Sequence, residues 1–199
     1  MAPIPPESSP VVAERGPAGD RVHGPRITPA SGEGATAELL RARRGGHLSD
    51  LDRLLLHSPP VAEGWNALLG ALRSGTTLPA DVRELVILRV AVLNDAAFEW
   101  TAHEPIGRRA GLDDARLTAL RAVVADAEPV WTPLQAAVLA FTDASTRAVA
   151  VPEPVFAALR EYLDDRQVVE LTATVAGYAM VSRFLVALAV PPPDGEVAG

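Results

Sequence analysis

The most regular apolar pattern of the chain, from 78 to 112, predicts two helices joined by a short polar break at Asn94-Asp95. Nearly every position from 85 to 93 is apolar, so the first helix is expected to be buried on most sides. Arg89 is the exception within it. A guanidinium inside such a run keeps its charge and needs a carboxylate or several carbonyl groups to offset desolvation. The pattern therefore predicts a close polar partner for Arg89.

The other helices are predicted from their starts, where a residue able to cap a helix stands before a proline or an apolar run. Apolar residues then recur at helical spacing, as they do from Val61 to Leu72. No stretch shows the sustained alternation of a strand, so the fold class is expected to be all-α. Helices are expected to begin near Ser58, Leu78, Asp95, Asp113, Thr132, Pro154 and Asp165, with the one after Asp113 running to about Val124.

Residues 1–35 differ in composition from the rest, because they hold seven of the 18 prolines and little periodic apolar pattern. We expect them to form a mostly disordered arm. Residues 36–190 are expected to form one helical domain, since 199 residues with 48% hydrophobic content suffice for a single sizeable core. Residues 191–199 are predicted to be a flexible tail.

Charge and cysteine content exclude several kinds of protein. A net charge of -7 argues against a nucleic-acid partner, because phosphate binding depends on clustered Lys and Arg. The absence of cysteine removes disulfides, zinc-thiolate sites and sulfur nucleophiles. No apolar core follows Met1, so a secretory signal is not supported and a cytoplasmic location is expected. The apolar segment 171–190 is interrupted by Arg183 and is expected to be a buried helix, so no membrane partner is predicted.

Candidate chemistry lies in AFEWTAH at 97–103, where Glu99 and His103 are four residues apart. This spacing places both side chains on one helix face, where they could move protons. Pro105 follows in the same predicted helix, and its ring crowds the carbonyl of Thr101 at a cost of about 3 kcal/mol unless the helix bends. A kink just after His103 is therefore expected.

These residues resemble the carboxymuconolactone decarboxylase and alkyl hydroperoxidase D (AhpD) superfamily. Its peroxidase branch has a Glu, eleven intervening residues and then C-x-x-C-x-x-x-H. Laid onto this chain, that pattern falls on Glu84, Ala96, Glu99 and His103, so both cysteines are absent and the thiol peroxidase cycle with them. The chain resembles the cysteine-free branch, from about Pro25 to about Val190. Further matching segments are GPRITP at 24–29, Trp65, RELVILRVA at 83–91, RRAGL at 108–112 and GYAM at 177–180.

The resemblance implies a compact AhpD-like helical domain, no cofactor and a homo-oligomer. Two very apolar helices, 85–93 and the last one, also offer more hydrophobic face than a single thin layer of helices covers. The first functional hypothesis is a cofactor-free lyase or isomerase acting on a small carbonyl or carboxylate substrate. His103 would be its acid-base residue, assisted by Glu99 and Glu84, with Arg89, Trp100 and Tyr178 as substrate-binding candidates. The second hypothesis is a non-catalytic oligomeric ligand-binding or scaffold protein.

Each candidate also has an ordinary structural interpretation. His103 could be a core histidine, and Glu99 could neutralise Arg89. Glu84 could stabilise the first turns of its helix, because a carboxylate there interacts favourably with the helix dipole. Trp100 and Tyr178 could simply pack. Glu84, Glu99 and His103 would be acceptable ligands for a transition metal, but spacing alone is unspecific and no metal is predicted. The remaining histidines, His23, His47 and His57, have no paired acid or base at motif spacing and are expected on the surface or in loops.

Overall fold

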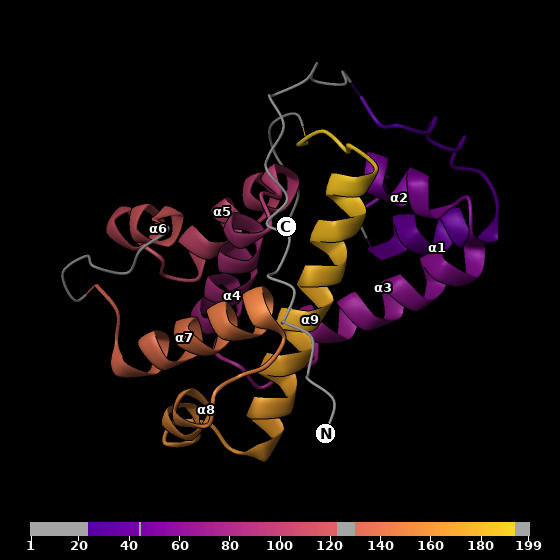
Figure 1. The fold of residues 1–199 in the computed structure, drawn as a ribbon. Coiled ribbons are helices and arrows are strands. Elements are labelled where there is room, and N and C mark those ends of the chain that lie inside the picture. Colours follow the sequence, from indigo (N-terminus) through magenta and orange to yellow (C-terminus); the bar gives the residue numbers. More distant parts are fainter. Residues whose placement is uncertain (1–23, 44, 123–129, 194–199) are drawn as a thin grey trace, which may run out of the picture.

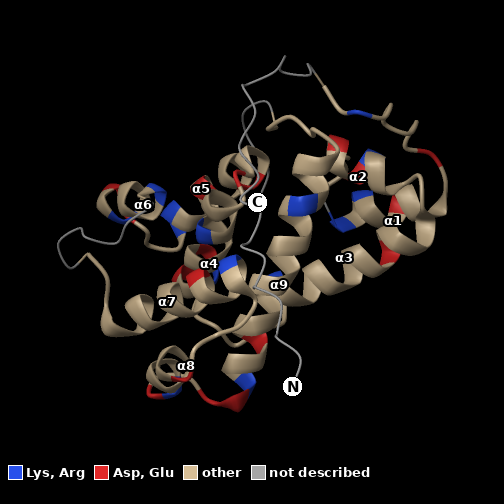
Figure 2. Ribbon diagram, in the orientation of Figure 1, with Lys and Arg blue, Asp and Glu red and all other residues tan. Residues whose placement is uncertain are grey.

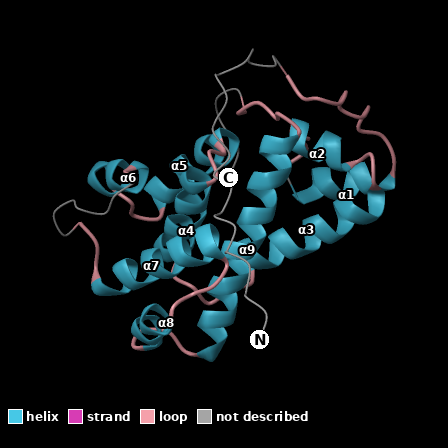
Figure 3. Ribbon diagram, viewed as in Figure 1, coloured by secondary structure: helices cyan, strands magenta, loops and turns pink. Residues whose placement is uncertain are grey.

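A computed structural model of the chain describes residues 24–43, 45–122 and 130–193 (Figure 1). Over these residues the chain forms nine helices and no strand, which confirms the all-α fold class (Figure 3). The helices are α1 (Ala35–Arg43), α2 (Asp50–Leu55), α3 (Pro59–Ser74), α4 (Ala80–Leu93), α5 (Ala97–Arg109), α6 (Asp114–Arg121), α7 (Pro133–Ala148), α8 (Glu153–Arg160) and α9 (Asp165–Ala187).

Helix α9 runs through the middle of the molecule, with α1 to α3 on one side and α4 to α8 on the other (Figure 1). It contacts α3, α4 and α7, while α4 also packs against α5, α6 and α7. Helix α4 is accordingly buried from Val82 to Ala91 except at Arg83, as its continuous apolar run predicted. The two helices that carry most of the core therefore also face each other.

Several predicted helix starts are confirmed by their hydrogen bonds. The Thr132 side chain accepts from the Gln135 amide, and Gln135 returns a bond to the Thr132 amide, which makes a capping box. Asp113 caps α6 through the amide of Arg116. Helix α9 is capped by Asp164, one residue before the predicted Asp165. Caps of this kind can be predicted from the sequence because they form within one turn of chain.

The prediction that Asp95 caps the helix bearing the motif was wrong. Asp95 has a φ of 56° and instead terminates α4 in the left-handed conformation. Its amide donates to the Val92 carbonyl, and the Ala96 amide donates to the Ala91 carbonyl at 2.8 Å. Ala96 is the N-cap of α5, without a side-chain cap. This tight turn folds α5 back along α4, so residues from both helices can meet.

Close packing of α5 on α4 depends on Gly107. A Cβ there would lie 3.0 Å from the Leu88 Cδ1 and 3.7 Å from the Glu84 Cβ. Helix α5 continues through Pro105 to Arg109, and the kink expected after His103 stays a prediction. The predicted left-handed cap after α5 is confirmed at Gly111, which has a φ of 107°.

Other boundaries differ from the expectation. Helices α1 and α2 were not predicted, although Ser49 and Asp52 form a capping box at α2. Helix α6 ends at Arg121 rather than near Val124, and residues 123–129 lie outside the described residues, as do 1–23 and 194–199. The last part of the predicted arm is held on the body of the protein. The amide of Arg26 donates to the Leu188 carbonyl at 2.8 Å, and the amide of Ala30 donates to the Arg53 carbonyl at 3.2 Å.

Helix α9 is, among the residues that the structure describes, the one helix long and apolar enough to cross a membrane by length and composition. However, 56% of its most apolar window is buried inside the protein. A core helix passes the same test of composition, and α9 packs as a core helix does. Helices α9 and α3 carry few charged residues along their length (Figure 2).

Candidate functional site

Glu84 and His103 meet between α4 and α5. The Nδ1 atom of His103 lies 2.8 Å from Oε2 of Glu84, and the two residues are 7% and 2% exposed. A carboxylate can only accept, so Nδ1 carries a proton, and when the ring is neutral Nε2 is then an acceptor. The second Glu84 oxygen, Oε1, is 3.5 Å from the Nε of Arg83. The carboxylate thus fixes the tautomer and orientation of the histidine.

Tyr178 of α9 faces the other ring nitrogen of His103. Its hydroxyl lies 3.4 Å from Nε2, and the two rings meet edge to face with centroids 5.2 Å apart. The hydroxyl also accepts a 3.1 Å hydrogen bond from Nε of Arg73, at the end of α3. Burial raises the pKa of Tyr178, so it is a neutral phenol that donates toward His103.

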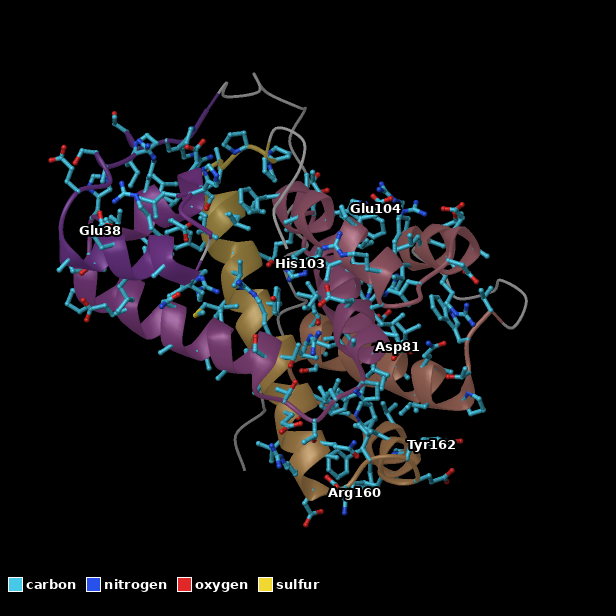
Figure 4. All side chains as sticks on the ribbon, turned by 180° about the vertical axis from the view of Figure 1, so that it is seen from behind. Glu38, Asp81, His103, Glu104, Arg160 and Tyr162 are labelled. Atoms are coloured by element: carbon cyan, nitrogen blue, oxygen red, sulfur yellow. The ribbon has the colours of Figure 1, made fainter. Side chains whose placement is uncertain are left out.

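Donors and acceptors therefore form one directional chain from Arg73 through Tyr178 and His103 to Glu84. Its members come from α3, α9, α5 and α4, so the chain crosses the centre of the fold. At 3.4 Å the contact between Tyr178 and His103 is longer than an ordinary O–H···N bond and is the weakest step. Figure 4 labels His103 on the side of α5 that faces α9.

Glu99 lies one helical turn before His103 and is 2% exposed. Its Oε2 is 2.7 Å from the hydroxyl oxygen of Ser182, which is also 2.8 Å from the Tyr178 carbonyl. A serine hydroxyl has one proton, and the Tyr178 carbonyl can only accept. If Ser182 gives that proton to the carbonyl, the remaining bond requires a proton on Glu99.

The electrostatics agree with a protonated Glu99. Burial raises its pKa from the ordinary 4.5 to about 8, and the Ser182 hydroxyl and the charge of Arg73 only partly offset this. At neutral pH Glu99 is therefore a carboxylic acid inside the core. It has the form required of a proton donor.

Arg89 lies elsewhere and already has partners. Its Nε and Nη2 each donate to Asp143 at 2.6 Å, and its Nη1 donates to the carbonyls of Leu120 and Ala122 at 2.9 Å. The partner expected from the sequence is thus Asp143 of α7, not Glu99. Arg89 was a substrate-binding candidate, but its donor groups are already used by these partners.

Trp100 also points away from His103. Its indole N–H donates to Glu104 at 2.7 Å, and the Arg121 guanidinium lies 3.9 Å from the ring centroid. Figure 4 shows Glu104 on the part of α5 away from α9. Trp100 and Arg121 line a separate open pocket of ≈ 390 Å³ formed by α4, α5 and the end of α6. The structure therefore brings Tyr178, but not Arg89 or Trp100, to the Glu84 and His103 pair.

Among the described residues, no three His, Asp or Glu side chains form a group that could hold a metal ion. Glu84 and His103 contact each other, whereas the carboxyl of Glu99 is bonded to Ser182. His47 is exposed, and Nε2 of His57 lies 2.8 Å from the Thr28 carbonyl. His23 lies outside the described residues.

Sequence reasoning missed Arg73, Arg83 and Ser182. Arg83 precedes Glu84 directly, and Ser182 follows Tyr178 by one helical turn, so both stand beside residues that were singled out. Arg73 had no such signal, because its 105-residue separation from Tyr178 is bridged only by the packing of α3 on α9.

The comparisons with known proteins agree with this fold. Residues 59–144 match the carboxymuconolactone decarboxylase family. Similar solved structures include a protein of unknown function from Agrobacterium tumefaciens, proposed to be the antioxidant defence protein AhpD. It is 24% identical, with a TM-score of 0.66 over 71% of this chain and 97% of that one. No curated protein matches the chain.

Two further structures have the same fold. An uncharacterised peroxidase-related protein from Silicibacter is 19% identical, with a TM-score of 0.69 over 87% of this chain and 91% of that one. The debrominase Bmp8, in complex with 2,3,4-tribromopyrrole, is 15% identical, with a TM-score of 0.66 over 77% of this chain and 81% of that one. The match over residues 59–144 and these structures support a place in the carboxymuconolactone decarboxylase and AhpD-like superfamily. At these identities the solved structures show the fold alone.

Proposed function

We propose that the protein is a cofactor-free acid-base enzyme, a lyase or isomerase that transfers protons next to a carbonyl group of a small substrate. The observation that carries this proposal is the buried hydrogen-bonded chain from Glu84 through His103 to Tyr178. A histidine held by a carboxylate on one nitrogen presents the other nitrogen as a base.

Each residue then has a definite part in the reaction. Nε2 of His103 removes a proton from the carbon next to the carbonyl, and Glu84 stabilises the imidazolium that forms. The Tyr178 hydroxyl turns from His103 to the substrate oxygen and donates to its developing negative charge. The proton returns to carbon from the His103 imidazolium, or from the Glu99 carboxyl, which is protonated at neutral pH and must then recover a proton from the imidazolium. In an isomerisation the proton count balances without any other reactant.

Two comparisons support a small organic substrate. The family is named for the decarboxylation of a small lactone, and Bmp8, which shares the fold, is a debrominase found with 2,3,4-tribromopyrrole. This chain cannot use a thiol nucleophile, because it contains no cysteine. The two cysteine positions of the family pattern hold Ala96 and Glu99. Catalysis would therefore use the carboxyl and imidazole groups of Glu84, Glu99 and His103.

His103→Gln is the decisive variant. With a substrate found by mass spectrometry of co-purified small molecules, or from a panel of oxo acids and enol lactones, we expect turnover to fall at least about 100-fold. Loss of the base should also slow deuterium incorporation at carbon, measured by proton NMR in D2O. His47→Gln makes the same chemical change at an exposed site and should keep the wild-type rate. A His103→Gln protein with undiminished exchange would remove the catalytic proposal.

One observation favours the second candidate, a non-catalytic ligand-binding or scaffold protein. Glu84, Glu99, His103 and Tyr178 are each less than a tenth exposed, and a buried network of this kind also gives a core a unique arrangement. That function predicts that His103→Gln lowers the thermal midpoint strongly and changes no reaction rate. The enzyme predicts a large loss of rate with the midpoint little changed.

We also propose that the protein forms a homo-oligomer through α3 and α9. Large apolar side chains are exposed on two helices that carry few charged residues (Figure 2): Val61 and Leu68 of α3, and Val169, Met180 and Val186 of α9. Light scattering at micromolar concentration should give at least a dimer, and Leu68→Glu should shift it toward the monomer. Tyr162→Glu, beyond the end of α8, is the control and should leave the mass unchanged. A wild-type monomer under these conditions would contradict the proposal.

A further inference from the structure

Arg73 stands at the outer end of the buried chain. It lies in the last turn of α3 and is partly exposed, while the Tyr178 hydroxyl that it contacts belongs to a residue only 1% exposed. Only its Nε is used in that bond. Within the part of the chain that the structure describes, Arg73 forms no ion pair. Its two terminal nitrogens, with four N–H donors, are therefore open to another group.

The charge of Arg73 is also not balanced by its neighbours. Glu99 is protonated at neutral pH, so it supplies no negative charge. Glu84 is engaged on one oxygen by His103 and on the other by Arg83. Arg73 and Arg83 are therefore balanced by one negative charge, that of Glu84, which leaves a net charge of about +1. A single bound anion would neutralise this charge.

Arg89 shows how this chain treats an arginine with a structural role. That guanidinium is buried, pairs with both oxygens of Asp143 and donates to two carbonyls. Arg73 has a single hydrogen bond, to a phenol, and is partly exposed to solvent. Arg73 thus combines an open guanidinium edge with a hydrogen bond to Tyr178, one of the proposed acid-base residues.

We propose that Arg73 is the specificity-determining residue of the site and binds the carboxylate of a small monoanionic oxo acid. The inference rests on the proposed function for the site's chemistry, but it concerns binding rather than proton transfer. A planar guanidinium edge fits a carboxylate with two parallel hydrogen bonds. With the carboxylate on the terminal nitrogens, a carbonyl a few bonds away comes to the Tyr178 hydroxyl, which Nε of Arg73 holds in place.

Binding can be measured without knowing the natural substrate. The probes are pyruvate, acetoacetate and levulinate, which place a carbonyl at increasing distance from the carboxylate, together with their uncharged methyl esters. Titrations of 15N-labelled protein follow the Nε–H signal of Arg73, assigned by its loss in Arg73→Gln. We expect the acids to shift this signal and the esters not to. Arg73→Gln should weaken binding of the best acid by about 10- to 100-fold.

Two matched variants make the result specific. Arg109→Gln removes the same charge from an exposed position at the end of α5 and should bind as the wild type does. Arg73→Lys keeps the charge without the planar edge and should lie between the wild type and Arg73→Gln. Circular dichroism and thermal midpoints verify that each variant is folded. Where Arg73→Gln does not fold, the Arg73→Lys titration and the signal shift in the wild type decide.

The outcome also separates this inference from the proposed function. His103→Gln should bind the acid with wild-type affinity, so retained binding without turnover supports both. If Arg73→Gln loses binding but His103→Gln keeps the wild-type turnover, the anion site is supported and the acid-base mechanism is contradicted. No shift of the Arg73 signal with any acid at millimolar concentration, or esters binding as tightly as acids, would overturn the role of Arg73.

Discussion

Replacing Arg89 by alanine is expected to lower the free energy of unfolding by about 3–5 kcal/mol, because it breaks a largely buried ion pair from one side. Asp143 would lose both 2.6 Å hydrogen bonds, and the carbonyls of Leu120 and Ala122 would lose their shared donor. Arg89 joins α4 to α7 and to the end of α6, so the loss acts on three helices at once. Urea denaturation at 25 °C measures the change from the midpoint and slope.

Arg147→Ala is the matched control, because Arg147 approaches the same Asp143 from solvent. Its Nε lies 3.8 Å from Oδ2 of Asp143, and its side chain is 50% exposed. An exposed pair of this kind contributes at most about 1 kcal/mol. Equal effects of the two substitutions would mean that the Arg89 network is not the structural tie inferred from its geometry.

The sequence predicted Arg89's need for a partner but not the partner itself. The need follows from one helix, since a charge in an apolar run must be compensated wherever that run is buried. The choice of Asp143 depends on how α7 packs across α4, over a separation of 54 residues. By contrast, the caps at Thr132 and Asp113 could be predicted, because each forms between residues within one helical turn. Asp95 failed as a cap because its left-handed backbone belongs to the end of α4, a role more often taken by glycine.

In the candidate site, too, the local features could be predicted from the sequence and the contacts between helices could not. The spacing of Glu99 and His103 fixes their common helix, but their partners come from other helices, Glu84 from α4 and Ser182 from α9. The resemblance to the family led to Glu84 and Tyr178. Nothing local indicated Arg73. What a single sequence leaves open is thus the set of contacts made by packing, and in this site those contacts determine the protonation of Glu99 and the tautomer of His103.

The protonation of Glu99 predicts how stability should depend on pH. The folded protein holds a proton on Glu99 up to about pH 8, whereas the unfolded chain releases it near the ordinary pKa of 4.5. The folded pKa is the higher one, so this contribution is fully present below pH 4.5 and is lost as the pH rises through 8. A shift of this size corresponds to at most about 4–5 kcal/mol between the two limits. Urea denaturation across pH 4 to 9 measures it.

Glu99→Gln isolates this effect, because glutamine resembles the protonated acid, can donate its amide to Ser182 and does not titrate. All other groups titrate alike in both proteins, so the wild-type free energy of unfolding should fall relative to that of Glu99→Gln as the pH rises from 5 to 8. The exposed Glu161→Gln removes a carboxylate elsewhere and should keep the wild-type dependence. Parallel curves for wild type and Glu99→Gln would show that Glu99 is ionised throughout. In that case Ser182 would donate to a carboxylate, and Glu99 would lose its place as the proton donor.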